Sequence, residues 1–154
     1  KRSNPTWTGF ASANSSEPSA ARLRLWTSLG VVLLFLNLLA AASLRHKAGA
    51  FSGHLVLALT ASAALLTGVF RAMRDFRDAP QLIKAAKMVA HTVGLQLGLG
   101  LATWAFLFGP LMTELSDERS RFLVQTLLAT GHLVLGVVLM AAATNFALES
   151  RRAR

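Results

Sequence analysis

Three histidines lie inside long stretches of this chain that contain no charged side chain: His54, His91 and His132. Two axial imidazoles can hold the iron of haem b, and a single imidazole is enough for the magnesium of chlorophyll. Ionisable groups at membrane depth are costly and usually functional. The alternative role is an interhelical hydrogen bond. The sequence therefore contains three candidate cofactor ligands. The alternative, that these histidines serve only in helix packing, stays open.

Four charge-free segments must position these histidines, and each is long enough to cross a bilayer as a helix. They are residues 25–44, 48–70, 88–113 and 122–148. A spanning helix needs about 20 mostly apolar residues. Only 15% of the residues are charged, against about a quarter in soluble domains. A soluble bundle would show a polar face every 3.6 residues, and residues 31–36 have none. We therefore predict an all-α, four-helix transmembrane bundle.

The loops that connect these segments contain residues that favour turns and helix starts. Residues 47–50 suit a tight turn, Pro80 suits the first turn of the third helix, and Ser116 suits the N-cap of the fourth. Helices joined by short loops pack as antiparallel neighbours. The predicted topology is therefore up-down-up-down, which puts both termini on one side of the membrane.

Basic residues are distributed unequally between the two sides that this topology defines. The chain has 16 Lys and Arg against 7 Asp and Glu, a formal charge of +9. The side with the termini holds Lys1, Arg2, Arg22, Arg24, Arg71, Arg74, Arg77, Lys84, Lys87, Arg151, Arg152 and Arg154, and the other side holds Arg45, Lys47, Arg119 and Arg121. Basic residues favour the side from which insertion occurs. We expect both termini in cytoplasm, stroma or matrix, and we expect no nucleic-acid partner because the charges line a membrane edge.

The segments outside the spans divide the chain into three parts. Residues 1–21 form a polar N-terminal extension, residues 22–150 the transmembrane domain, and residues 151–154 a basic C-terminal tail. The extension has the composition of a linker or a transit-peptide remnant. It cannot order itself by burying its own apolar surface. We expect it to lie against a partner, with Trp7 and Phe10 as anchors.

The depths of the three histidines distinguish them. Counted from the span midpoints, His54 lies about 7 Å and His132 about 4 Å toward the sparsely basic side, on spans that run parallel. His91 lies about 14 Å toward the basic side. Haem b therefore has one sensible ligand pair, His54 with His132, whereas chlorophyll could use any of the three. Gly94 and Gly98 share a face with His91 and form a small-xxx-small motif that permits close approach of another helix.

Short motifs around these histidines resemble an uncharacterised four-helix membrane family from cyanobacteria and chloroplasts, itself similar to cytochrome b561 proteins. The resemblance covers roughly residues 25–147 and rests on residues 44–47 (Leu-Arg-His-Lys), 53–54 (Gly-His), 91–95 (His-Thr-Val-Gly-Leu) and 109–112 (Gly-Pro-Leu-Met). The family carries a histidine near the start of its last span, where this chain has residues 122–125 (Phe-Leu-Val-Gln). The resemblance implies a photosynthetic or bioenergetic membrane: a thylakoid, or an inner organellar or bacterial membrane.

The sequence contains no nucleophile–histidine–acid set, no metal motif, no phosphate loop and no carboxylate within the spans. We therefore predict a non-catalytic, multi-pass accessory subunit of a larger photosynthetic or respiratory membrane complex, whose partners are the bilayer and other subunits. The alternative is a cytochrome b561-like haem b electron carrier that uses His54 and His132. A pigment-binding subunit that uses His54, His91 or His132 singly is a variant of the first prediction.

Overall fold

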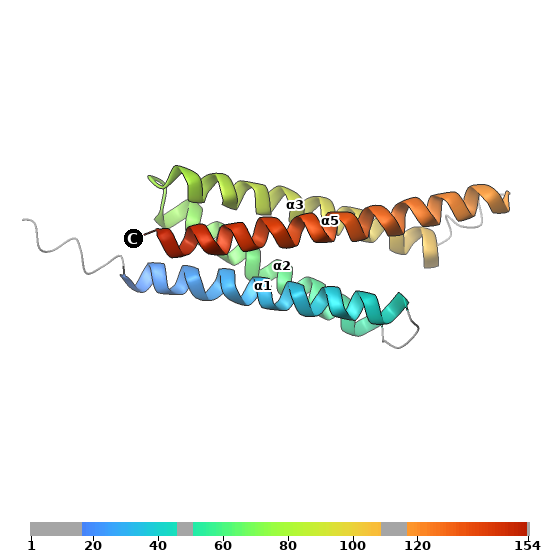
Figure 1. Cartoon of the computed structure of the whole chain (residues 1–154), viewed down its shortest axis with the longest axis horizontal. Coiled ribbons are helices and arrows are strands. Elements are labelled where there is room, and N and C mark those ends of the chain that lie inside the picture. Colours follow the sequence, from blue (N-terminus) through green and yellow to red (C-terminus); the bar gives the residue numbers. More distant parts are fainter. Residues whose placement is uncertain (1–16, 46–50, 109–116, 154) are drawn as a thin grey trace, which may run out of the picture.

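The computed structural model describes residues 17–45, 51–108 and 117–153. Four helices account for nearly all of them: α1 (Glu17–Arg45), α2 (Phe51–Asp75), α3 (Pro80–Phe108) and α5 (Glu118–Arg152) (Figure 1). Each helix is long and apolar enough to cross a membrane. The predicted all-helical fold with four candidate spans is therefore confirmed.

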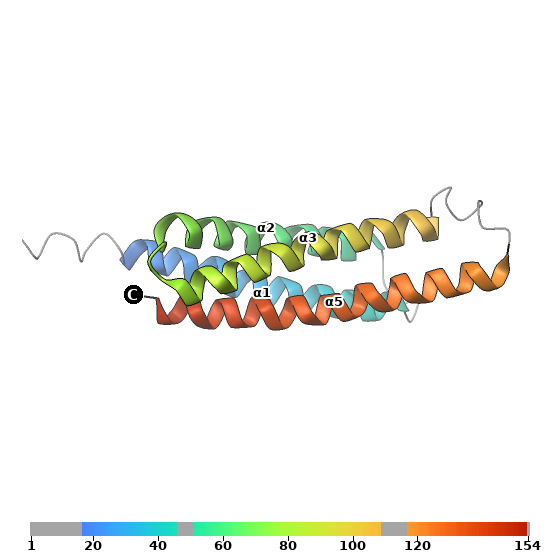
Figure 2. The ribbon, with the colours of Figure 1, turned by 90° about the horizontal axis from the view of Figure 1, so that it is seen from above.

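The helices lie lengthwise beside one another (Figures 1 and 2). The main contacts join α1 to α2, α2 to α3, α3 to α5, and α5 to α1. This pattern makes a four-sided ring in which α2 and α5 occupy diagonal positions. Side chains from α2 and α5 can therefore meet only across the interior of the bundle.

The residues at the starts of α3 and α5 explain where these two helices begin. Proline begins α3, as predicted, because the fixed φ of Pro80 suits the first helical turn. The N-cap of α5 is Asp117, one residue later than the Ser116 predicted from the sequence. The Asp117 carboxylate accepts hydrogen bonds from the Ser120 and Arg119 backbone N–H groups, at 2.9 and 3.3 Å, and a carboxylate also suits the positive end of the helix dipole. Ser116 itself lies outside the described residues.

Hydrogen bonding also sets the charge state of this cap. The Ser120 hydroxyl donates to Asp117 at 2.8 Å. This bond, followed by the two backbone bonds, holds the pKa of Asp117 below its usual value. The cap therefore stabilises the folded state fully above the ordinary aspartate pKa. Its contribution is lost as the pH falls through the lowered one.

Helix α1 begins at Glu17, inside the predicted polar extension, and α5 continues to Arg152 in the predicted C-terminal tail. Helix α1 starts earlier than predicted because Ala20 and Leu23 are buried against the other helices. Some predicted features lie outside the described residues: Trp7, Phe10, the 47–50 turn and the end of the 88–113 span.

The buried core occupies one half of the bundle. Leu23, Leu65, Val89 and Phe146, one from each helix, are fully buried there. The hydroxyls of Thr27 and Ser150, both 0% exposed, share a hydrogen bond of 3.0 Å that joins the start of α1 to the end of α5. We call this the closed half.

The other half, which we call the open half, has no buried residue in the described segments. All described buried residues lie within residues 20–37, 61–72, 82–93 and 136–150, and none lies within 38–43, 51–60, 94–106 or 117–135. In Figure 1, α5 diverges from α1 toward this end. The four helices are therefore held together mainly by the closed half.

Candidate functional site

Four polar side chains, one from each helix, lie where the buried core ends. They are Asn37, His54, Gln96 and His132, and we call them the polar layer. His54 lies 21 residues before the end of α2, and His132 lies 20 residues before the end of α5. Asn37 lies 20 residues after the start of α1, and Gln96 lies 16 residues after the start of α3. The layer therefore forms the boundary between the closed and open halves.

The two histidines of the polar layer approach each other across the diagonal of the ring. The ring centroids of His54 and His132 are 6.5 Å apart, and the ring planes are 85° from parallel. Both side chains are partly buried. The structure thus brings together the pair that the sequence placed at similar depth on parallel spans.

Every member of the polar layer has a buried polar atom without a hydrogen-bond partner. These atoms are Asn37 Oδ1, His54 Nδ1, Gln96 Oε1 and His132 Nδ1. Asn37 is only 7% exposed, so bulk solvent does not reach its side chain freely. Unpaired polar atoms are costly in an apolar interior. The layer therefore has hydrogen-bonding or ligating capacity that the described side chains leave unused.

Gln96 and two glycines fix the position of His132. The Gln96 Nε2–H group donates to the backbone oxygen of His132 at 3.2 Å, and Gln96 Nε2 lies 3.4 Å from His132 Nε2. A Cβ at Gly100 would lie 3.0 Å from Cε1 of His132, and a Cβ at Gly136 would lie 3.3 Å from Gln96 Nε2. Any residue larger than glycine would therefore crowd the His132 ring or the Gln96 amide.

The contact of Gln96 with His132 was missed by the sequence analysis. The midpoint of the charge-free segment 88–113 put Gln96 and His132 on opposite sides of the span centres. Helix α3 starts at Pro80, however, and includes Lys84 and Lys87 in its first turns. Counting from Pro80, the N-terminal helix signal, would have placed Gln96 within about one turn of the histidine level.

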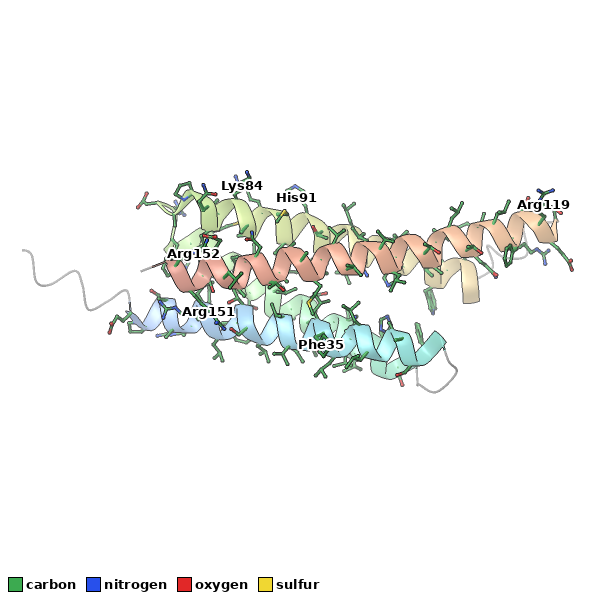
Figure 3. The ribbon with its side chains drawn as sticks, viewed as in Figure 1. Phe35, Lys84, His91, Arg119, Arg151 and Arg152 are labelled. Carbon is green, nitrogen blue, oxygen red and sulfur yellow. The ribbon has the colours of Figure 1, made fainter. Side chains whose placement is uncertain are left out.

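His91 lies away from the polar layer, on the outer face of α3 (Figure 3). Its Nδ1–H donates to the carbonyl oxygen of Lys87 at 2.7 Å, which leaves the lone pair on Nε2. Gly94 and Gly98 are also exposed, and a Cβ built at either position would meet no atom within 4 Å. The three candidate histidines therefore form an inner pair and a single outer residue.

The inner pair has a spacing that suits two axial ligands. Two imidazoles bound to opposite sides of one metal ion, each through a bond of about 2.0–2.1 Å, have ring centroids about 6 Å apart. The observed 6.5 Å is close to this value. Because Nε2 of His132 faces Gln96, ligation through that atom requires the Gln96 amide to withdraw. Among the described residues, no group of three or more His, Cys, Asp or Glu side chains could hold a bare metal ion.

Comparison with known proteins does not add to this geometry. The chain matches no protein-family model, no curated protein and no solved structure. The similarity to the cyanobacterial and chloroplast four-helix family therefore stays a prediction, and any functional conclusion rests on the helices and the side chains described above.

Proposed function

We propose that this protein is a non-catalytic accessory subunit of a larger energy-converting membrane complex. Its four apolar helices indicate association with a lipid bilayer. Between 11% and 33% of the residues in the most apolar part of each helix are buried within the chain. Most of each helix surface is therefore free to contact lipid or the helices of other subunits.

The outward glycines of α3 carry this proposal. Gly94 and Gly98 lie one turn apart on an exposed face, with open space where a side chain would be. Packing inside the bundle does not use them, and contact with lipid gives no reason for glycine, which weakens a helix by about 1 kcal/mol relative to alanine. Two glycines at this spacing allow the backbone of a second helix to approach closely. A helix of another subunit is the occupant that fits this surface.

The orientation that we propose is up-down-up-down, with both termini in cytoplasm, stroma or matrix. The support is the excess of basic residues at the end where α1 starts and α5 ends. The resemblance noted from the sequence favours a thylakoid membrane, or an inner organellar or bacterial membrane. His91, on the same outer face as the glycines, supplies one free imidazole nitrogen for a chlorophyll if the complex is photosynthetic.

Replacing Gly98 with leucine is expected to release the protein from its complex without unfolding it. The new side chain blocks close approach on the outer face of α3, whereas no atom of the described residues lies within 4 Å of its Cβ position. Membranes solubilised in mild detergent and separated on a native gel would show the wild type in a large species and Gly98→Leu in a small one. Gly53→Leu is the matched control, because Gly53 is also exposed and none of the described residues has an atom within 4 Å of its Cβ position.

Migration of the wild-type protein at its own mass would contradict the accessory role. So would equal release of Gly53→Leu and Gly98→Leu, because the effect would then not depend on the α3 face. Helical circular dichroism of each purified variant, equal to that of the wild type, excludes unfolding as the cause of release.

A second candidate function, a haem b electron carrier, is favoured by the inner histidine pair. His54 and His132 are 6.5 Å apart between ring centroids, come from diagonal helices and each have an unpartnered Nδ1. Haem b would supply one-electron chemistry, and this chain would supply both axial imidazoles. The Gln96 amide already contacts His132 and has an unpartnered oxygen. A rotated Gln96 amide would accept the second N–H of a ligating imidazole, the usual way in which ligand orientation is fixed.

Visible spectra of the protein purified from haem-supplied cells test this candidate. After dithionite, the wild type and His91→Ala are expected to show a sharp α-band, and His54→Ala and His132→Ala to lose it. The matched control is His91, which is exposed and outside the polar layer. Absence of the band from the wild type would reject the haem candidate. A pigment band lost only in His91→Ala would instead place chlorophyll on the outer face.

A further inference from the structure

The end of the closed half that contains the start of α1 and the end of α5 carries more positive charge than its own acids neutralise. Nine described basic residues lie there: Arg22, Arg24, Arg71, Arg74, Arg77, Lys84, Lys87, Arg151 and Arg152. Four described acids lie with them: Glu17, Asp75, Asp78 and Glu149. Asp75 and Glu149 are already paired, with Arg74 and Arg152 respectively, at 2.6 Å. Among the described residues, the basic side chains at this end therefore outnumber the acidic ones by nine to four.

Arg71 is the member of this group with a buried, unsatisfied donor. Its Nε is shielded from solvent and has no hydrogen-bond acceptor among the residues that the structure describes. It lies one turn before the end of α2, between the buried residues Val69 and Ala72. Both oxygens of the nearby Asp75 carboxylate accept from Arg74, at 2.6 and 3.2 Å, and neither accepts from Nε of Arg71. A guanidinium with a dry and unpaired N–H is costly.

Arg22 belongs to the same cluster although it is on another helix. It lies at the start of α1, and both Arg22 and Arg71 act electrostatically on Asp75. This shared electrostatic effect indicates that Arg22 and Arg71 face the same end of the bundle, where Asp75 is paired with Arg74. A further oxyanion is the partner that this arrangement lacks.

We propose that Arg71, assisted by Arg22, binds the phosphate group of an anionic phospholipid at this end of the bundle. Guanidinium groups bind phosphate through paired N–H···O hydrogen bonds. Because Nε of Arg71 is shielded from solvent, this binding requires the Arg71 side chain to turn outward, which also removes its unsatisfied donor from the interior. Arg71 lies one turn from the end of a candidate membrane span, the level at which lipid phosphates are found. Basic pockets between transmembrane helices bind anionic headgroups in this way. The inference does not depend on the complex partner or on haem.

Lipid binding to the purified full-length protein tests the proposal. Native mass spectrometry in detergent, with added phosphatidylglycerol or phosphatidylcholine, is expected to show a bound phosphatidylglycerol on the wild type. Arg71→Gln is expected to bind it about tenfold more weakly, as for loss of one charged hydrogen-bonding group. Arg71→Lys, which keeps the charge and loses the paired donors, is expected to give an intermediate result. The matched control is Arg119→Gln, at the opposite end of the molecule (Figure 3).

Competition with inorganic phosphate distinguishes a lipid headgroup from free phosphate as the source of the bound phosphate group. No displacement of phosphatidylglycerol by phosphate assigns the site to the lipid headgroup, whereas full displacement assigns it to free phosphate. Equal binding of phosphatidylcholine and phosphatidylglycerol, or unchanged binding by Arg71→Gln with wild-type helical content, would overturn the proposal. If Arg71→Gln does not fold, Arg22→Gln gives the same comparison from α1.

Discussion

Replacing Gly30 with valine is expected to separate α1 from α2. A Cβ at Gly30 would lie 2.5 Å from Cδ2 and 2.8 Å from Cγ of Leu65, and the Leu65 backbone nitrogen is 3.4 Å away. Leu65 is fully buried, so its side chain has no free space into which to rotate. We expect a loss of about 3 kcal/mol in the free energy of unfolding, the upper end of the range for overpacked cores. Thermal unfolding in detergent, followed by circular dichroism, measures it.

The matched control for this change is Gly98→Val. It makes the same substitution inside a helix, at a position where a Cβ meets no atom within 4 Å. The intrinsic helix preference of valine is therefore the same in both variants, and only the packing differs. Equal unfolding midpoints for Gly30→Val and Gly98→Val would show that α1 and α2 do not pack as described.

Single cysteines at the two ends of the bundle are expected to react from opposite sides of the membrane. The chain has no cysteine of its own. Arg151 and Arg119 are both exposed arginines at opposite ends of α5 (Figure 3). In intact cells, a membrane-impermeant maleimide is expected to label Arg119→Cys from outside and to label Arg151→Cys only after permeabilisation. The physical reason is the retention of the more basic end on the side of insertion.

The opposite labelling pattern would reverse the proposed orientation. Labelling of both cysteines from outside in intact cells would mean that the chain does not span the membrane through α5. Each substitution removes one positive charge, and neither reverses the excess of basic residues at the end that holds Arg151.

The number of helices and the meeting of two histidines could be predicted from the sequence for the same reason. A spanning helix has a length fixed by the bilayer, so charge-free segments reveal it without any homologue. The same fixed length allows the depth of a residue to be counted from the midpoint of its span. This count placed His54 and His132 at similar depth. In the structure their ring centroids are 6.5 Å apart.

The direction in which each helix face points could not be predicted in this way. In a soluble protein, polar residues mark the outer face, but lipid is as apolar as a protein core. The glycines of α1 and α3 illustrate the problem: Gly30 is pressed against Leu65, whereas Gly94 and Gly98 face outward. The sequence placed His91 on one face with Gly94 and Gly98, but it could not show that this face points outward.

The unequal packing of the two halves has an energetic consequence for anything that binds at the polar layer. A tightly filled interior must lose its own contacts before a guest can enter, and that loss is subtracted from the affinity. Here the open half has no buried side chain in its described segments. A flat guest inserted from that side would leave the contacts around Phe146 and Leu65 intact. The affinity would then be reduced less than in a filled interior, and the withdrawal of the Gln96 amide is the rearrangement that remains for ligation through Nε2 of His132.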